Sequence, residues 1–256
     1  MKSLGITCAL ALWLGVGTGI AAGPSLAGTW KLNLSKSKLT GTTFSIEKAA
    51  SGLLHFDSQG FAFDFDLTGK EYPAPDGTTV AYRALDANTW EQTTRMNHKV
   101  VEVAVSKLTQ DTVTMTAKLT KPDGSTVEQT SKAVRVSGGP EFLGKWKSTE
   151  VGGAATTMVI ALEGANGIAV NYPEYQFSVK GSFDGKDNVA TVAGANLKFT
   201  VAFEKTGRAG FKMTSKMDGK PFLVDVLTLS PDGKTLTDAG NPTAVNEPTT
   251  AVYERQ

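Results

Sequence analysis

The sequence predicts an all-β protein with two tandem antiparallel up-and-down β-barrels after an N-terminal signal peptide. Three observations lead to this prediction: apolar and polar residues alternate over many short segments, Asp-Gly and similar turns separate these segments, and a Gly-x-Trp sequence occurs twice. Alternation with a period of two is typical of strands with one buried face. No segment beyond residue 22 shows the 3.6-residue period of an amphipathic helix.

The first 22 residues have the pattern of a secretory signal peptide. Lys2 precedes an uncharged apolar run over residues 4–20, and small residues follow from Ala21 onward. A cationic start, an apolar stretch and small residues before cleavage define such a signal. We expect cleavage within residues 21–27, a periplasmic or secreted product, and no membrane span in the mature chain. A retained membrane anchor is the alternative, because the run is nearly long enough to cross a bilayer.

Composition limits the chemistry of the mature chain. The 256 residues include 26 Lys and Arg, 25 Asp and Glu, two His and a single cysteine, Cys8, which lies in the signal segment. Without Lys2 the charges balance, which argues against a nucleic-acid partner, because that binding depends on a strong positive field. A chain without cysteine forms no disulfide or Cys-based zinc site. We therefore expect no metal and no cofactor.

The chain carries a diverged internal repeat. One segment, Gly28-Thr29-Trp30-Lys31, recurs 116 residues later as Gly144-Lys145-Trp146-Lys147. Farther along the chain the offset becomes 121, which aligns Trp90 with Phe211. Between the copies lies Ser137-Gly138-Gly139-Pro140, which cannot easily continue a strand. The sequence therefore predicts a first barrel domain over residues 23–138 and a second over residues 139–256.

Both repeats read as hairpin-connected strands. Phe61, Phe63 and Phe65 alternate with smaller or charged residues, and Phe199 to Phe203 follow the same pattern. Turn pairs such as Asp232-Gly233 tolerate positive φ and favour hairpins. A sheet of eight to ten such strands avoids exposed edges by closing into a barrel, with a two-sheet sandwich as the alternative.

The Gly-x-Trp openings resemble the first strand of lipocalins and fatty-acid-binding proteins, the calycin group. Phe142 to Lys147 is similar to a fatty-acid-binding protein start, and Val252 to Arg255 resembles that family's last strand. The first repeat also resembles secreted bacterial lipocalin-like proteins. The resemblance implies that each Trp plugs one barrel end and that a basic residue of the last strand covers its ring. We expect this structural role for Gly28, Trp30, Arg135, Gly144, Trp146 and Arg255. We expect Trp146→Ala to unfold the second repeat at 37 °C.

No convincing catalytic set is present. Ser35 and Lys38 have a Ser-x-x-Lys spacing, but they follow a strand in a polar segment rather than lying on a helix. Both histidines, His55 and His98, read as surface or turn residues, and we predict no catalytic residue.

These observations favour an exported, non-catalytic monomer that binds a small apolar ligand. The ligand would contact inward-facing aromatic residues, for which the candidates are Phe61, Phe63, Phe65, Trp90, Phe177 and Phe211. The same residues could instead simply fill the barrels. Two further functions stay open: a structural or protein-interaction module of the cell envelope, and an enzyme on the same scaffold that uses Glu71, Tyr72 or Tyr175.

Overall fold

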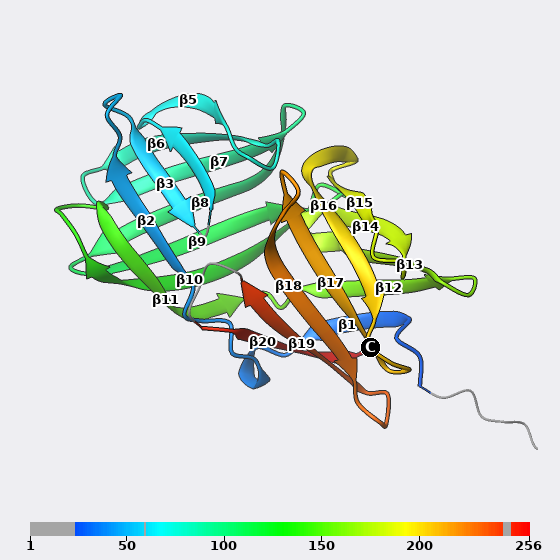
Figure 1. The fold of residues 1–256 in the computed structure, drawn as a ribbon. Helices are drawn as coiled ribbons and strands as arrows, with labels where there is room; N and C mark the ends of the chain where they lie inside the picture. The colour runs from blue at the N-terminus through cyan, green and yellow to red at the C-terminus, as the bar shows by residue number, and fades with distance from the viewer. Residues whose placement is uncertain (1–23, 59, 243–246) are drawn as a thin grey trace, which may run out of the picture.

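The computed structural model describes residues 24–58, 60–242 and 247–256, and these form an almost entirely β structure (Figure 1). The predicted signal peptide, including Cys8, lies outside the described residues. The helices of the described ranges are two 3-10 turns, η1 (Leu34–Lys36) and η2 (Pro173–Tyr175). No helix there is long and apolar enough to cross a membrane. The predicted fold class is confirmed: two antiparallel, barrel-shaped sheets contain ten strands each.

The first sheet curls into a barrel-like shape from ten strands in the order β4-β3-β2-β11-β10-β9-β8-β7-β6-β5. Its two edge strands, β4 and β5, follow each other in the chain but form no ladder. The strands are β2 (Thr43–Lys48), β3 (Leu54–Ser58), β4 (Phe61–Phe65), β5 (Thr68–Pro73), β6 (Thr79–Asp86), β7 (Thr89–Met96), β8 (Lys99–Thr109), β9 (Thr112–Thr120), β10 (Thr126–Ser137) and β11 (Gly144–Gly153).

The second sheet is a closed barrel in the order β1-β12-β13-β14-β15-β16-β17-β18-β19-β20. The last strand pairs with the first, so the described sheet has no edge. The strands are β1 (Gly28–Leu32), β12 (Thr157–Glu163), β13 (Gly167–Tyr172), β14 (Phe177–Ser182), β15 (Asp187–Val192), β16 (Ala195–Lys205), β17 (Gly210–Met217), β18 (Lys220–Leu229), β19 (Thr235–Pro242) and β20 (Thr249–Arg255).

The opening strands of the two repeats are exchanged between the sheets. β1 pairs with β12 and β20 of the second repeat, whereas β11 pairs with β10 and β2 of the first. In Figure 1 the blue β1 accordingly lies beside the green β12 and the red β20. The division at residues 138 and 139 therefore separates the sequence repeats but not the sheets. The first sheet is one continuous stretch from β2 to β11, and the second combines β1 with β12 to β20.

The base of each sheet is closed by a buried tryptophan. Trp30 and Trp146 are both fully buried, and each indole N–H donates to the carbonyl four residues earlier, Leu26 or Phe142, at 3.0 Å. The guanidinium of Arg255 lies 4.1 Å from the Trp30 ring centroid. Both indoles are therefore buried with an arginine over the ring, and the exchange gives each ring an arginine from the other repeat.

The second plug has the same construction. Arg135 lies 4.3 Å from the Trp146 ring centroid and directly opposite it in the ladder between β10 and β11. Its guanidinium donates to the carboxylate of Asp111 at 2.9 Å and to the backbone carbonyls of Gly139, Glu141 and Leu143. These bonds fix the loop between β10 and β11 against the base of the first sheet.

The glycine of each Gly-x-Trp is required by close packing. A Cβ atom on Gly28 would lie 2.4 Å from Nη1 of Arg255, and one on Gly144 would lie 2.3 Å from the Ser137 carbonyl oxygen. Both glycines also have positive φ, +153° and +129°. Glycine therefore admits the arginine in one plug and the crossing backbone in the other.

The sheets also contact each other away from the exchanged strands. Lys198 donates its backbone N–H to the Asp76 carbonyl at 2.8 Å, and the Gln176 side chain donates to the Thr120 carbonyl at 2.6 Å. Met96, in the hairpin between β7 and β8, is buried within the core cluster of the second sheet. The two sheets thus share apolar and polar contacts.

We predict that Trp146→Ala destabilises the sheet formed by β2 to β11, and not the second sheet as expected for repeats that fold separately. Removal of a buried Trp costs about 3–5 kcal/mol, and the lost cation–π contact adds about 0.5–2 kcal/mol. Hydrogen exchange during mild denaturation should show earlier opening of β2 to β11. Val136→Ala, at an exposed position beside Arg135, serves as the control. Earlier opening of β12 to β20 would contradict the assignment.

The strand exchange predicts which engineered disulfide can form in a chain with no cysteine after Cys8. Thr29 lies opposite Val159 in the ladder between β1 and β12, so Thr29→Cys with Val159→Cys should give an intramolecular disulfide. Without exchange, Thr29 would lie near Ser45, the partner of Lys145 in the ladder between β2 and β11. Thr29→Cys with Ser45→Cys is therefore the control. Mass spectrometry of the dilute monomer without reductant shows whether each variant forms its disulfide. A disulfide in the control variant alone would refute the exchange.

Candidate functional site

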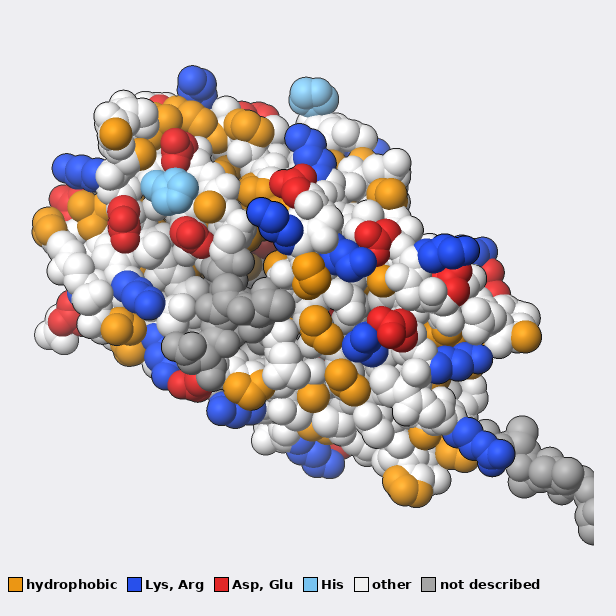
Figure 2. All heavy atoms as spheres, viewed as in Figure 1, with side chains coloured by type: hydrophobic (Ala, Val, Ile, Leu, Met, Phe, Trp, Pro, Cys, Tyr) orange, Lys and Arg blue, Asp and Glu red, His pale blue; other side chains and the backbone are white. Residues whose placement is uncertain are grey.

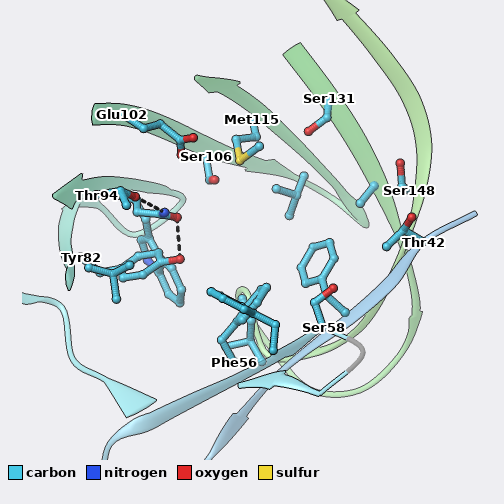
Figure 3. Close-up of a pocket in the computed structure, with 18 of the residues that line it drawn as sticks. Thr42, Phe56, Ser58, Tyr82, Thr94, Glu102, Ser106, Met115, Ser131 and Ser148 are labelled. Atoms are coloured by element: carbon cyan, nitrogen blue, oxygen red, sulfur yellow. Dashed lines mark hydrogen bonds between the residues drawn. The ribbon is translucent and has the colours of Figure 1, made fainter. Parts of the chain in front are cut away.

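The first sheet encloses a cavity of about 590 Å³ (Figure 3). β2, β3, β4 and β11 supply one wall and β6 to β10 the other, with aromatic side chains gathered on the side of β3 and β4. This volume lies within the range of small-molecule sites. The aromatic lining consists of Phe44, Phe56, Phe61, Phe63, Tyr82, Trp90 and Phe142.

A polar row crosses the opposite wall of this first cavity. The Tyr82 hydroxyl donates to Oε1 of Gln92 at 2.6 Å, and Nε2 of Gln92 donates to the Thr94 hydroxyl at 3.0 Å (Figure 3). Glu102 also points into the cavity, and burial raises the pKa of its carboxyl group. Burial and the nearby Glu102 raise the pKa of Tyr82 as well, so its phenol stays protonated and can donate.

The predicted aromatic residues of the first repeat divide between lining and filling. Phe61, Phe63 and Trp90 line the first cavity. Phe65 is fully buried beneath it, 4.1 Å from the ring centroid of Tyr82 and 6.2 Å from that of Trp90. Trp90 in turn stacks on Phe142 at 4.1 Å. The lower part of the sheet is therefore packed, and the cavity occupies the part above it.

The second sheet holds a separate cavity of about 470 Å³. Its apolar lining comes from Phe177, which was predicted, and from Phe199, Phe222, Met213 and Met217, which were not. The other predicted residue, Phe211, is fully buried and packs against Phe183 and Phe203 instead of the cavity. The second sheet thus repeats the division seen in the first.

Two aspartates lie inside this second cavity. Asp225 of β18 and Asp238 of β19 line it and are only 6% and 9% exposed. Within the described residues neither carboxylate forms an ion pair, and Oδ1 of Asp238 is buried without a hydrogen-bond partner. Burial raises the pKa of both groups, and the charge of Asp238 raises that of Asp225 further.

Tyrosines complete the polar end of the second cavity. Tyr172 of β13 lines it, close to Tyr253 of β20. Burial raises the pKa of both phenols, and the two aspartates add to this effect. Two uncharged phenols thus lie near two acids, and the part of the lining that the structure describes contains no lysine or arginine.

Two residues belong to the lining of both cavities. Phe61 of β4 and Asp76 of the turn between β5 and β6 contact the first and the second cavity. The backbone bond from Lys198 to Asp76 holds this turn against the second sheet. The cavities of the two sheets therefore adjoin at one wall.

Of the polar residues that line the two cavities, the sequence suggested only Tyr175, which lines the second. The others were missed, although a signal is present. Asp225 has the same strand parity as Leu227 and Leu229, and Asp238 has that of Leu236, so each interrupts an apolar face. Of the enzyme candidates, Glu71 and Tyr175 are exposed, and the Tyr72 hydroxyl donates to Asp66 at 2.8 Å. These three do not form a common site.

Comparisons with protein-family models, with curated proteins and with solved structures found no match for this chain.

The buried aspartates predict how stability depends on pH. In the folded protein both pKa values lie above the ordinary value of 3.8, so the folded state holds more protons than the unfolded state. The free energy of unfolding should therefore fall as the pH rises from about 4 into the range of the raised pKa values. Each pKa unit by which folding raises a group contributes about 1.4 kcal/mol to this fall. The variant Asp225→Asn with Asp238→Asn should lose this part of the slope in urea titrations. Parallel curves for variant and wild type would contradict the prediction.

Proposed function

We propose that this is an exported, non-catalytic lipocalin-like protein that binds small apolar molecules inside its two sheets. The observation that carries the proposal is the pair of aromatic-lined cavities above packed, tryptophan-plugged bases. Cavities of a few hundred Å³ with apolar walls and a few polar groups are the usual form of small-molecule sites. The lipocalin-like assignment is supported by the doubled Gly-x-Trp and by the arginine over each indole.

The polar groups of each cavity favour amphipathic ligands over pure hydrocarbons. In the first cavity the Tyr82–Gln92–Thr94 row and Glu102 offer hydrogen-bond partners opposite the phenylalanine wall. A ligand with an apolar body and one polar end would satisfy both sides. Export is supported by the signal-like segment at the start of the chain.

The molecular surface gives no support to a nucleic-acid partner. Lys and Arg side chains lie among Asp and Glu on the face shown in Figure 2. Many of these charges are paired at the surface, as in Lys132 with Glu150 at 2.8 Å and Lys212 with Glu204 at 2.8 Å. Phosphate backbones require a continuous positive field instead.

An enzyme on this scaffold is the second candidate, and the aspartates of the second cavity favour it. Catalytic acids and bases often have pKa values shifted by burial and by a like charge. Asp225 and Asp238 meet this description, although neither is among the candidates that the sequence suggested. Turnover of a bound ligand, lost in Asp238→Asn, would distinguish this candidate from a binder.

Filling the first cavity should abolish binding there. Ser106 lines the cavity, whereas its neighbour Lys107 is exposed. We expect Ser106→Phe to reduce the binding of a neutral fluorescent apolar probe such as N-phenyl-1-naphthylamine by about half, since the second cavity remains. Lys107→Phe is the matched control and should bind as the wild type does. Equal binding by both variants, or no binding by the wild type, would contradict a ligand site in this sheet.

A further inference from the structure

We propose that the second cavity binds an alkyl amine, with its ammonium group between Asp225 and Asp238 and its chain against the aromatic wall. This inference rests on the proposed function and specifies the ligand class of one of the two cavities.

The carboxylates identify the head group. Both are more than nine-tenths buried and line the same cavity from adjacent strands. Buried charges in proteins are normally paired or hydrogen-bonded, because an unpaired one loses its hydration without compensation. Oδ1 of Asp238 is buried and has no hydrogen-bond partner within residues 24–58, 60–242 and 247–256. A ligand that brings a positive charge and N–H donors supplies what this end of the cavity lacks.

No described residue that lines this cavity is a lysine or an arginine. Tyr172 of β13 and Tyr253 of β20 face the aspartates with neutral phenols, and Tyr175 of η2 lies nearby. Asp76 adds a third carboxylate to the lining. The two lysines of β17 belong to the outer face, where Lys212 pairs with Glu204 and Lys216 with Asp187. The alternating lining residues of that strand, Met213 and Ser215, are uncharged.

The aromatic side chains of the second cavity favour an alkyl chain on the ligand. Phe177 and Phe199 stack with centroids 6.1 Å apart, and Phe222 meets Phe199 edge to face at 5.8 Å. Met213 and Met217 complete a flexible apolar surface. A carboxylic acid or a phosphate ester would place its anion beside two acids, whereas an alkyl ammonium ion is attracted to them. The two acids of the first cavity, Glu102 and Asp76, come from β8 and from the turn between β5 and β6, whereas Asp225 and Asp238 lie on adjacent strands. The preference for an ammonium group therefore belongs to the second cavity.

The test compares decylamine, decanol and decanoate, which share one chain and differ in charge. Binding to the full mature protein is measured by calorimetry below the micellar concentration of each probe. At pH 8 we expect decylamine to bind at least tenfold more tightly than the other two. Decyltrimethylammonium, which has the charge without an N–H donor, should bind with intermediate affinity. Lowering the pH to 5 should weaken decylamine binding, because the aspartates become protonated while the amine stays charged.

Variants place the effect at the two carboxylates. Asp225→Asn and Asp238→Asn should each reduce the affinity for decylamine about tenfold or more and leave that for decanol unchanged. Asp187→Asn removes a carboxylate from the outside of the same barrel and should bind like the wild type. Because decanol binding reports the intact cavity, a variant that loses all three probes would show a structural role and overturn the inference.

The experiment distinguishes a failure of the amine assignment from a failure of ligand binding in general. Equal affinity of wild type for decylamine, decanol and decanoate would overturn the amine assignment and leave the apolar binding function standing. No binding of any decyl probe would overturn ligand binding in both cavities, and the amine assignment with it.

Discussion

The structure depends on one interaction, the stacking of an arginine from a final strand on the tryptophan of an opening strand. Each indole is fully buried and bonded through its N–H, so the arginine covers the remaining open side of the ring. The same guanidinium of Arg255 donates to the carbonyls of Ala27, Gly233 and Ser25, and thereby ties together three segments distant in sequence. Gly28 must lack a side chain for this to happen, since a Cβ atom would occupy the space of the guanidinium.

The strand exchange follows from the order of strands along the chain. β10 is the last strand of the first repeat and β11 is the first strand of the second, and only residues 138–143 separate them. Such neighbours form a local antiparallel hairpin, and sequential strands pair in most sheets. Without exchange, β10 would have to pair with β1, about a hundred residues earlier, at a higher cost in loop-closure entropy. Once β11 occupies that place in the first sheet, the second lacks an opening strand, and β1 supplies it.

The sequence was sufficient for the fold class, because alternation, Asp-Gly turns and the doubled Gly-x-Trp are local signals that local physics enforces. It also identified Trp30, Trp146 and the two arginines, since their motif is a short run of residues. Which arginine covers which indole could not be predicted, because the two repeats are alike and either pairing satisfies the same local contacts. All inward-facing residues of a strand occupy alternate positions, whether they pack the core or line a cavity. Alternation therefore cannot show that Phe65 and Phe211 are packed in the core while Phe61 and Phe177 line a cavity.

Divergence between the sheets is concentrated in the polar residues of their interiors. The first cavity contains a row in which Tyr82, Gln92 and Thr94 satisfy one another, and such a network is stable without a ligand. The second contains Asp225 and Asp238, whose burial disfavours their charged forms. A fold that tolerates this unfavourable energy does so because the plugs and ladders at the base stabilise the barrel independently of the cavity end. Among the described contacts, the aspartates belong to the cavity end of the barrel and take no part in the contacts around Trp30.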